Sequence, residues 1–482
     1  MREARKLPEI IQGGMGIGVS GWRLARAVSE CGQLGVVSGT ALDSVLVRRL
    51  QEGDPEGHLR RAMALFPIPG VADDVLRRYF RPEGLPPGTP YKLLPVYRQT
   101  VSRSRQQLTM LANFVEVYLA REGHGGPVGI NLLTKIQFPT LASLYGAMLA
   151  GVDCVLMGAG IPREIPAVLD ALAEHRPATL RFEVEGLPPG TTEHLRLDPG
   201  EHWSQPPAPL QRPLFLPIIA SNSLATVLAR KASGRVDGFI IEGPTAGGHN
   251  APPRGDPKFN ERGEPLYGER DVVDLAKVRE LGLPFWLAGG TGQPGRLREA
   301  QQEGATGIQV GTLFAYCDES DLREDLKRSV LEHVARGQVD VFTDPQASPT
   351  GYPFKVVRWS ADPGATAPPR ERICDLGYLR VAYFTPEGTI DYRCASEPVD
   401  AYVRKGGKAE DTEGRRCLCN ALLANIGHPQ ARVGGQLEPP LLTSGDDLVS
   451  LSSFLAGRSR YSAAEVIAYL LSSGPAALPA GG

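Results

Sequence analysis

Short apolar runs alternate with amphipathic helical segments through most of the chain. The runs are rich in valine, isoleucine and leucine, as expected for strands buried on both faces of a parallel sheet. Eight of them lie at residues 9–12, 35–39, 127–132, 152–158, 215–220, 236–241, 284–290 and 306–312. This alternation predicts an α/β fold, and the eight strands favour a closed (β/α)8 TIM barrel over an open doubly wound sheet.

Several stretches interrupt the alternation. Residues 65–100 are rich in proline and glycine and predict an excursion over the surface. Residues 178–213 contain an additional strand pattern between turns and predict an inserted hairpin or flap. After residue 340 the sequence becomes rich in turn-forming residues, and helical periodicity returns only near residues 418–426, 446–455 and 463–471. We therefore expect a barrel over residues 1–340 and a C-terminal extension over residues 341–482.

Charge and hydropathy narrow the classes of partner. The chain has 52 basic and 54 acidic residues, which gives no electrostatic reason to expect nucleic acid or an anionic membrane as a partner. No run approaches the roughly 18 apolar residues of a membrane span, and Met1–Lys6 is not followed by the apolar region of a signal peptide. These features predict a soluble, cytoplasmic protein that acts on small molecules, with its oligomeric state left open.

The extension contains most of the cysteines. Four of the seven lie there, at Cys374, Cys394, Cys417 and Cys419. Thiolates bind zinc and iron–sulfur clusters, and we predict one of these at the four residues. The spacing also permits reduced, metal-free cysteines, because only Cys417 and Cys419 form a close pair, whereas zinc ribbons usually have two.

Polar residues and glycines recur where the predicted strands end. Parallel strands of a barrel bring their carboxyl ends to one rim, where the active sites of such barrels lie. Backbone N–H groups in glycine-rich turns can hold a phosphate there. The residues concerned are Gln12, Gly13, Gly14 and Met15 after the first strand, Asn131 at the third, Glu242 at the sixth, Gly289 and Gly290 after the seventh, and Gly311 and Thr312 after the eighth. This pattern predicts a phosphate-bearing cofactor at the rim.

The loop after the sixth strand carries the residue best suited to proton transfer. Gly247 and Gly248 let the backbone approach a ligand closely, and His249 follows them. A histidine has an unperturbed pKa of about 6.5, which suits proton transfer near neutral pH. Alone, the loop could equally carry an incidental surface histidine, but the predicted cofactor gives His249 a ligand to face.

Four motifs together resemble the nitronate monooxygenase family, formerly called 2-nitropropane dioxygenases. They are Ile10–Gly16, Gly247–His249, Ala288–Gly290 and Gly304–Thr312, and the resemblance covers roughly residues 8–335. It implies a barrel that binds FMN without a covalent link. It also implies oxidation of nitronates or nitroalkanes with O2, with the flavin taking the electrons.

The resemblance also implies roles for individual residues. Gln12 to Met15 would border the isoalloxazine, and Asn131 and Glu242 would contact the flavin or its ribityl chain. Gly289, Gly290, Gly311 and Thr312 would hold the phosphate. The loop residues Ala246, Gly247 and Gly248 would lie against the cofactor, and His249 matches the catalytic histidine of the family.

The substrate is less well specified than the cofactor. Some family members have a basic residue in the fifth strand, where this chain reads Leu216–Ile219, and the loop after the histidine, Asn250–Pro253, also departs from the usual glycine-containing turn. The same motifs are similar to those of flavin-dependent enoyl-thioester reductases of lipid and polyketide synthesis, which use NAD(P)H. A third possibility is a flavin-binding assembly subunit without catalysis.

Overall fold

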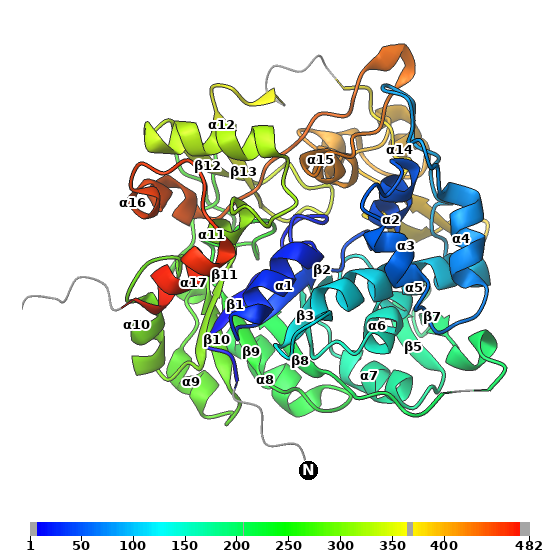
Figure 1. Cartoon of the computed structure of the whole chain (residues 1–482), viewed down its shortest axis with the longest axis horizontal. Coiled ribbons are helices and arrows are strands. Elements are labelled where there is room, and N and C mark those ends of the chain that lie inside the picture. The colour runs from blue at the N-terminus through cyan, green and yellow to red at the C-terminus, as the bar shows by residue number, and fades with distance from the viewer. Residues whose placement is uncertain (1–6, 206, 364–369, 473–482) are drawn as a thin grey trace, which may run out of the picture.

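A computed structural model describes residues 7–205, 207–363 and 370–472 of the chain. Its largest sheet has eight parallel strands, all of which the sequence predicts (Figure 1). They are β1 (Ile10–Gln12), β2 (Gly35–Ser38), β3 (Val128–Leu133), β4 (Cys154–Gly158), β8 (Leu214–Ile219), β9 (Phe239–Glu242), β10 (Phe285–Ala288) and β11 (Gly307–Val310).

The sheet closes on itself. The strands follow the order β1-β11-β10-β9-β8-β4-β3-β2, and the remaining gap is bridged by Leu34, the residue before β2. The N–H of Leu34 donates to Ile10 O at 3.1 Å, and Leu34 O accepts from the N–H of Gln12 at 3.0 Å. The prediction of a (β/α)8 barrel is therefore confirmed.

Apolar side chains fill both sides of the barrel wall. One buried cluster takes its residues from β1, β2, β4, β8, β9 and β10 and fills the barrel interior; it includes Ile11, Leu156, Ile240 and Trp286. A larger cluster joins the outer face of the strands to the helices. Because both faces are covered, each strand reads as an apolar run without alternation.

Helices follow the strands and surround the barrel. They are α1 (Trp22–Glu30), α2 (Leu42–Gln51), α3 (His58–Met63), α5 (Arg103–Arg121), α6 (Thr140–Leu149), α7 (Ile165–Ala173), α8 (Asn222–Lys231), α9 (Leu275–Arg279), α10 (Arg296–Gln302), α11 (Thr312–Ala315) and α12 (Glu324–Ala335). No helix in the described parts of the chain is long and apolar enough to cross a bilayer.

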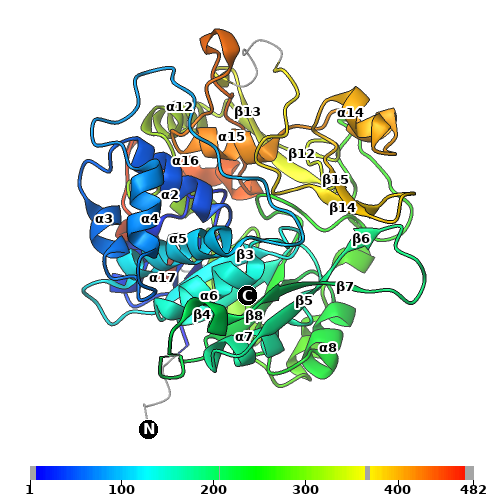
Figure 2. The same cartoon turned by 90° about the vertical axis from the view of Figure 1, so that its right-hand side faces the viewer.

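The inserted flap is present, and it is tied to the extension. Strands β5 (Ala178–Phe182) and β7 (Glu193–Leu197) form an antiparallel hairpin. Between them, β6 (Val184–Glu185) pairs in parallel with β14 (Val381–Phe384), which lies about 200 residues later in the chain (Figure 2). The region 65–100 differs from the expected excursion, because it contains helix α4 (Val71–Tyr79).

The extension contains β-strands that its turn-rich sequence did not predict. β12 (Val339–Asp344) pairs antiparallel with β13 (Phe354–Trp359), and β14 pairs with β15 (Ile390–Arg393). The helical elements that follow are α14 (Val399–Arg404), α15 (Leu418–Asn425), η5 (Asp446–Ser450), α16 (Leu451–Leu455) and α17 (Ala463–Leu471), while residues 473–482 of the predicted extension lie outside the described residues. Figures 1 and 2 both show α15, β13 and α16 on the same side of the barrel as α12.

A buried polar network joins the extension to the barrel helices. The Asp43 carboxylate of α2 lies 2.7 Å from Arg105 Nη1 of α5, and both side chains are less than a tenth exposed. Tyr97 donates to Asp43 at 2.7 Å, and Tyr378 of the extension also donates to it. Burial opposes ionisation of Asp43, but Arg105 and the two phenols outweigh it and hold the pKa of that carboxyl below its usual value.

Candidate cofactor site

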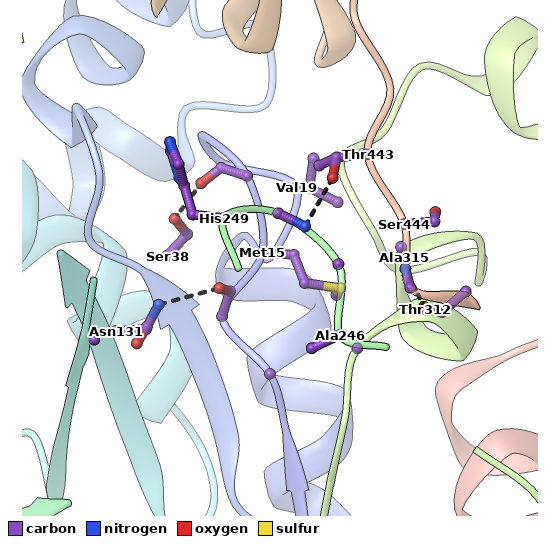
Figure 3. A pocket seen from close by; sticks show the side chains of 18 of the residues that line it. Met15, Val19, Ser38, Asn131, Ala246, His249, Thr312, Ala315, Thr443 and Ser444 are labelled. Atoms are coloured by element: carbon purple, nitrogen blue, oxygen red, sulfur yellow. Dashed lines mark hydrogen bonds between the residues drawn. The ribbon is translucent and has the colours of Figure 1, made fainter. Parts of the chain in front are cut away.

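A cavity at the carboxyl ends of the strands collects nearly all of the predicted site residues. Its walls include Gly13, Gly14, Met15, Asn131, Glu242, Ala246, Gly247, Gly248, His249, Gly289, Gly290, Gly311 and Thr312. These residues come from the ends of β1, β3, β9, β10 and β11. In Figure 3, Asn131 and His249 lie on one side of this cavity, and Thr312 lies on the other with Met15 between them.

Gln12 is the exception among the residues predicted to border a flavin. It is fully buried and does not line the cavity. Its amide oxygen accepts from the N–H of Val36 at 2.9 Å, and its amide nitrogen donates to Ser20 Oγ at 2.9 Å. Ser20 Oγ also accepts from the N–H of Met15 at 2.9 Å. Gln12 and Ser20 therefore fix the conformation of the loop that presents Gly13 to Met15, and Ser20 was not expected from the sequence.

Glycine is required where the first loop meets β3. A Cβ atom on Gly14 would lie 2.5 Å from Asn131 Cβ, which is too close for any side chain. This contact lets Asn131 Nδ2 donate to Gly14 O at 3.2 Å. The amide of Asn131 is thereby oriented at the cavity wall.

Two polar atoms at the cavity wall have no partner among the described residues. Asn131 Oδ1 and Gln309 Oε1 are buried without a hydrogen bond among the described residues. Buried polar atoms normally have partners, so unsatisfied acceptors beside a cavity indicate a ligand that donates. The hydroxyl groups of a ribityl chain and the ring N–H of an isoalloxazine are such donors. The residues present therefore fit FMN, and Gln309 is a cavity residue that the sequence-based site did not include.

The loop after β10 has the geometry of an anion cradle. Gly289 and Gly290 have φ of +87° and +69°, and a Cβ on Gly289 would lie 3.0 Å from Ala246 N. Within the described chain, the N–H groups of Gly290 and Thr291 make no backbone hydrogen bond. Free N–H groups in such a turn bind phosphate well. This turn includes two of the glycines predicted to hold the phosphate, and phosphate binding there stays a prediction.

His249 faces the cavity as a neutral imidazole. Burial, assisted by the positive charge of Lys135, lowers the pKa of His249 to about 4. Its Nε2 lies 2.7 Å from Ser348 Oγ, and its ring meets Phe354 edge-on with centroids 4.9 Å apart. At neutral pH the ring is unprotonated, so one nitrogen can accept a proton while the other bonds to Ser348.

The extension supplies the parts of the site that the sequence did not reveal. Ser348 and Phe354 position His249, and the cavity wall also includes Tyr378, Cys419 and Thr443. Nothing in the local sequence around these residues distinguishes them, because they reach the site only through tertiary packing between segments far apart in the chain. The sequence-based prediction for the extension concerned its four cysteines and did not include this contribution.

The four cysteines of the extension lie close together in space. Cys374, Cys394, Cys417 and Cys419 line one small cavity, and the neighbouring Cys394 together with burial raises the pKa of the Cys374 thiol. All four are free thiols. No three histidine, cysteine, aspartate or glutamate residues in the described ranges are arranged to hold a metal ion. Zinc or an iron–sulfur cluster at these cysteines stays an unconfirmed prediction.

Replacing Glu242 by glutamine is expected to remove a pH-dependent loss of stability. Burial raises the pKa of Glu242 from 4.5 to about 7. Between these values the folded state holds a proton that the unfolded state releases, so the free energy of unfolding falls as pH rises, by about 3 kcal/mol above pH 7. Thermal unfolding of flavin-free protein at pH 5 and pH 8 measures the difference. The exposed Glu299→Gln is the control, and an unchanged pH dependence in Glu242→Gln would contradict the assignment.

Comparisons with known proteins agree with the motifs. Residues 208–342 match the family model "Nitronate monooxygenase". A nitronate monooxygenase of Pseudomonas aeruginosa is 27% identical over 202 residues, which is 42% of this chain and 51% of that protein. The chain thus spans about half the length of the curated relative it matches. The resemblance to the nitronate monooxygenase family is confirmed.

Solved structures of low similarity cover most of the chain. FabK from Thermotoga maritima aligns with a TM-score of 0.46 and 18% identity, over 96% of this chain and 91% of its own. A nitroalkane oxidase from Streptomyces ansochromogenes aligns with a TM-score of 0.44 and 16% identity, over 96% and 94%. The enoyl reductase domain of MlnA from Bacillus amyloliquefaciens has a TM-score of 0.44 and 11% identity, over 97% and 96%.

Proposed function

We propose that this chain, which resembles the nitronate monooxygenases, is an FMN-dependent oxidoreductase that oxidises nitronates or nitroalkanes with O2. The observation that carries the proposal is that one cavity contains three features. They are a neutral His249, two amide oxygens without a hydrogen bond, and a glycine turn whose Gly290 and Thr291 N–H groups make no backbone hydrogen bond among the described residues. The first supplies a base, and the others supply contacts for a phosphate-bearing ligand with hydroxyl groups.

Each group has a part in binding or proton transfer. FMN, when bound, supplies an acceptor for the substrate's electrons and passes them to O2. The N–H groups of Gly290 and Thr291 would hold its phosphate, and Asn131 and Gln309 would accept from its hydroxyl or ring N–H groups. Glu242, with its pKa near 7, can donate a hydrogen bond to the ligand in its neutral form.

His249 would take the proton from the carbon next to the nitro group. Its Nδ1 has no hydrogen-bond partner in the described residues, whereas Nε2 is held by Ser348. When Nε2–H donates to Ser348, the lone pair on Nδ1 is available to the substrate. The lowered pKa keeps this nitrogen unprotonated at neutral pH, which is the state a base requires.

Flavin content and oxidation of a nitronate test the proposal together. Purified protein is expected to be yellow or to become so with FMN, and an alkyl nitronate should be consumed with O2 uptake. The measurements are the visible spectrum and an oxygen electrode trace. A protein that stays colourless and inactive after FMN addition would overturn the proposal.

A second candidate is an NAD(P)H-dependent reductase of enoyl thioesters. A cleft of about 1190 Å³ lies between the flap and the extension, and Leu379 lines both this cleft and the cofactor cavity. It offers room for a long thioester or a dinucleotide, with Lys135, Arg163 and Arg181 among its charged groups. Anaerobic NADPH that bleaches the flavin rapidly would favour this reductase. A flavin that neither NADPH nor nitronate reduces would favour a non-catalytic assembly role.

A further inference from the structure

A segment of the extension closes the cofactor cavity over the glycine turns. We call Thr443–Asp447 the strap. Thr443 Oγ1 accepts from the N–H of Gly248 at 2.8 Å, and the N–H of Gly445 donates to Thr312 Oγ1 at 3.0 Å. Figure 3 shows these two contacts on the side of the cavity away from Asn131. The strap thus lies between the loops that follow β9 and β11.

The strap packs closely against the loop that follows β9. A Cβ on Gly247 would lie 2.8 Å from Gly445 N, and a Cβ on Gly445 would lie 2.8 Å from Thr245 O. The N–H of Asp446 donates to Thr245 O at 2.9 Å, and Ser444 Oγ lies 2.8 Å from Tyr316 Oη. These backbone contacts fix the position of the next residue, Asp447.

Asp447 presents a carboxylate to the turn predicted to bind phosphate. Its Oδ2 accepts from the N–H of Gly292 at 3.1 Å, and Asp447 lines the same cavity as Gly289, Gly290 and Thr291. Burial raises the pKa of the Asp447 carboxyl. The Asp446 carboxylate acts in the same sense, while the Arg296 guanidinium favours ionisation of Asp447. A carboxylate held by an N–H at the end of this turn occupies one of the donors that an anion would use.

Its neighbour Asp446 has a different orientation. Asp446 Oδ1 lies 2.6 Å from Lys355 Nζ, which is buried, and Asp446 does not line the cavity. The two adjacent residues therefore have the same side chain in the same segment, but only that of Asp447 is directed to the glycine turn. This pair provides a matched test of what the direction does.

We propose that Asp447 is an internal anion that competes with the cofactor phosphate for the turn Gly289–Gly292, so that flavin binding displaces its carboxylate. The proposal rests on the proposed FMN-dependent function. Because two anions at one turn repel each other in a low-dielectric cavity, Asp447 lowers the affinity for FMN. It has no such effect on riboflavin, which lacks the phosphate. Asp447 thereby sets how readily the protein releases and exchanges its cofactor.

The test compares two flavins in three proteins. Full-length chain freed of flavin is titrated with FMN and with riboflavin, and dissociation constants are read from quenching of flavin fluorescence. Asp447→Asn is expected to bind FMN at least about tenfold tighter than the original protein, with riboflavin affinity unchanged. Asp446→Asn removes the same charge and loosens the strap, and its ratio of FMN to riboflavin affinity should stay as in the original.

Each alternative outcome contradicts either the competition by Asp447 or the proposed function. Equal or weaker FMN binding by Asp447→Asn overturns the competition. A gain in both variants shows a general charge or strap effect and also overturns it, as does an equal gain for riboflavin. Failure of the original protein to bind either flavin contradicts the proposed function instead, so the two failures are distinguishable. Thermal unfolding of both variants checks that they are folded.

Discussion

Replacing His249 by asparagine is expected to leave FMN binding intact and to lower turnover of a neutral nitroalkane at least about 100-fold. The imidazole lies at the cavity wall, is neutral at pH 7 and can accept a carbon-bound proton in the arrangement described above. Asparagine retains a polar group next to Ser348 but has no basic nitrogen. Steady-state rates with O2 uptake, at equal flavin occupancy, measure the loss.

A histidine away from the cavity controls for nonspecific effects. His194 lies on β7 of the flap with its side chain exposed, and His194→Asn should retain full turnover. If His249→Asn turns over at the original rate while holding FMN, His249 has no part in proton transfer. Loss of flavin from His249→Asn would assign the residue to cofactor binding rather than to chemistry.

Replacing Asp43 by alanine is expected to lower the free energy of unfolding by about 3–5 kcal/mol. The substitution leaves the Arg105 guanidinium buried without its carboxylate, and it removes the acceptor shared by Tyr97 and Tyr378. An unpaired buried charge is among the most destabilising changes in a protein interior. Urea unfolding followed by tryptophan fluorescence gives the change, and Asp43→Asn supplies a milder variant if the alanine protein does not fold.

The matched control for Asp43 is an ion pair on the surface. The Glu30 carboxylate lies 2.8 Å from the Arg26 guanidinium on α1, and the side chains of Arg26 and Glu30 are 35% and 48% exposed. Exposed pairs contribute roughly 0–1 kcal/mol, so Glu30→Gln should change the free energy of unfolding little. A similar small change for Asp43→Ala would show that the buried network does not stabilise the fold.

The barrel could be predicted because its signals are local. Each strand is an apolar run, and the turns after six of the eight contain glycine, so the eight strand positions follow from the local sequence pattern. Helix α4 was missed because proline and glycine surround it and hide the spacing of Val71, Val75 and Tyr79, all buried on one side. Strands β12 to β15 were missed for a similar reason, since short strands between turns read as loop.

The residues of the site also divide into those that the local sequence predicts and those that it does not. Residues at strand ends, such as Asn131 and Glu242, were placed correctly at the rim because the fold dictates where strand ends lie. The direction of a side chain could not be predicted from the sequence. Gln12 shows this, since its side chain points into the loop that it stabilises. Ser348 and Asp447 could not be predicted as site residues, because they contact the barrel only through the tertiary packing of the extension.

The pairing of β6 with β14 has a consequence for biosynthesis. A ribosome delivers the chain from its N-terminus, and the last barrel strand is complete at Val310. The flap at that stage lacks its partner strand, and the cavity lacks Ser348, Thr443 and Asp447. The nascent barrel therefore passes through a stage with an open rim and an unpaired flap edge. The final third of translation determines when the protein becomes competent to retain a ligand.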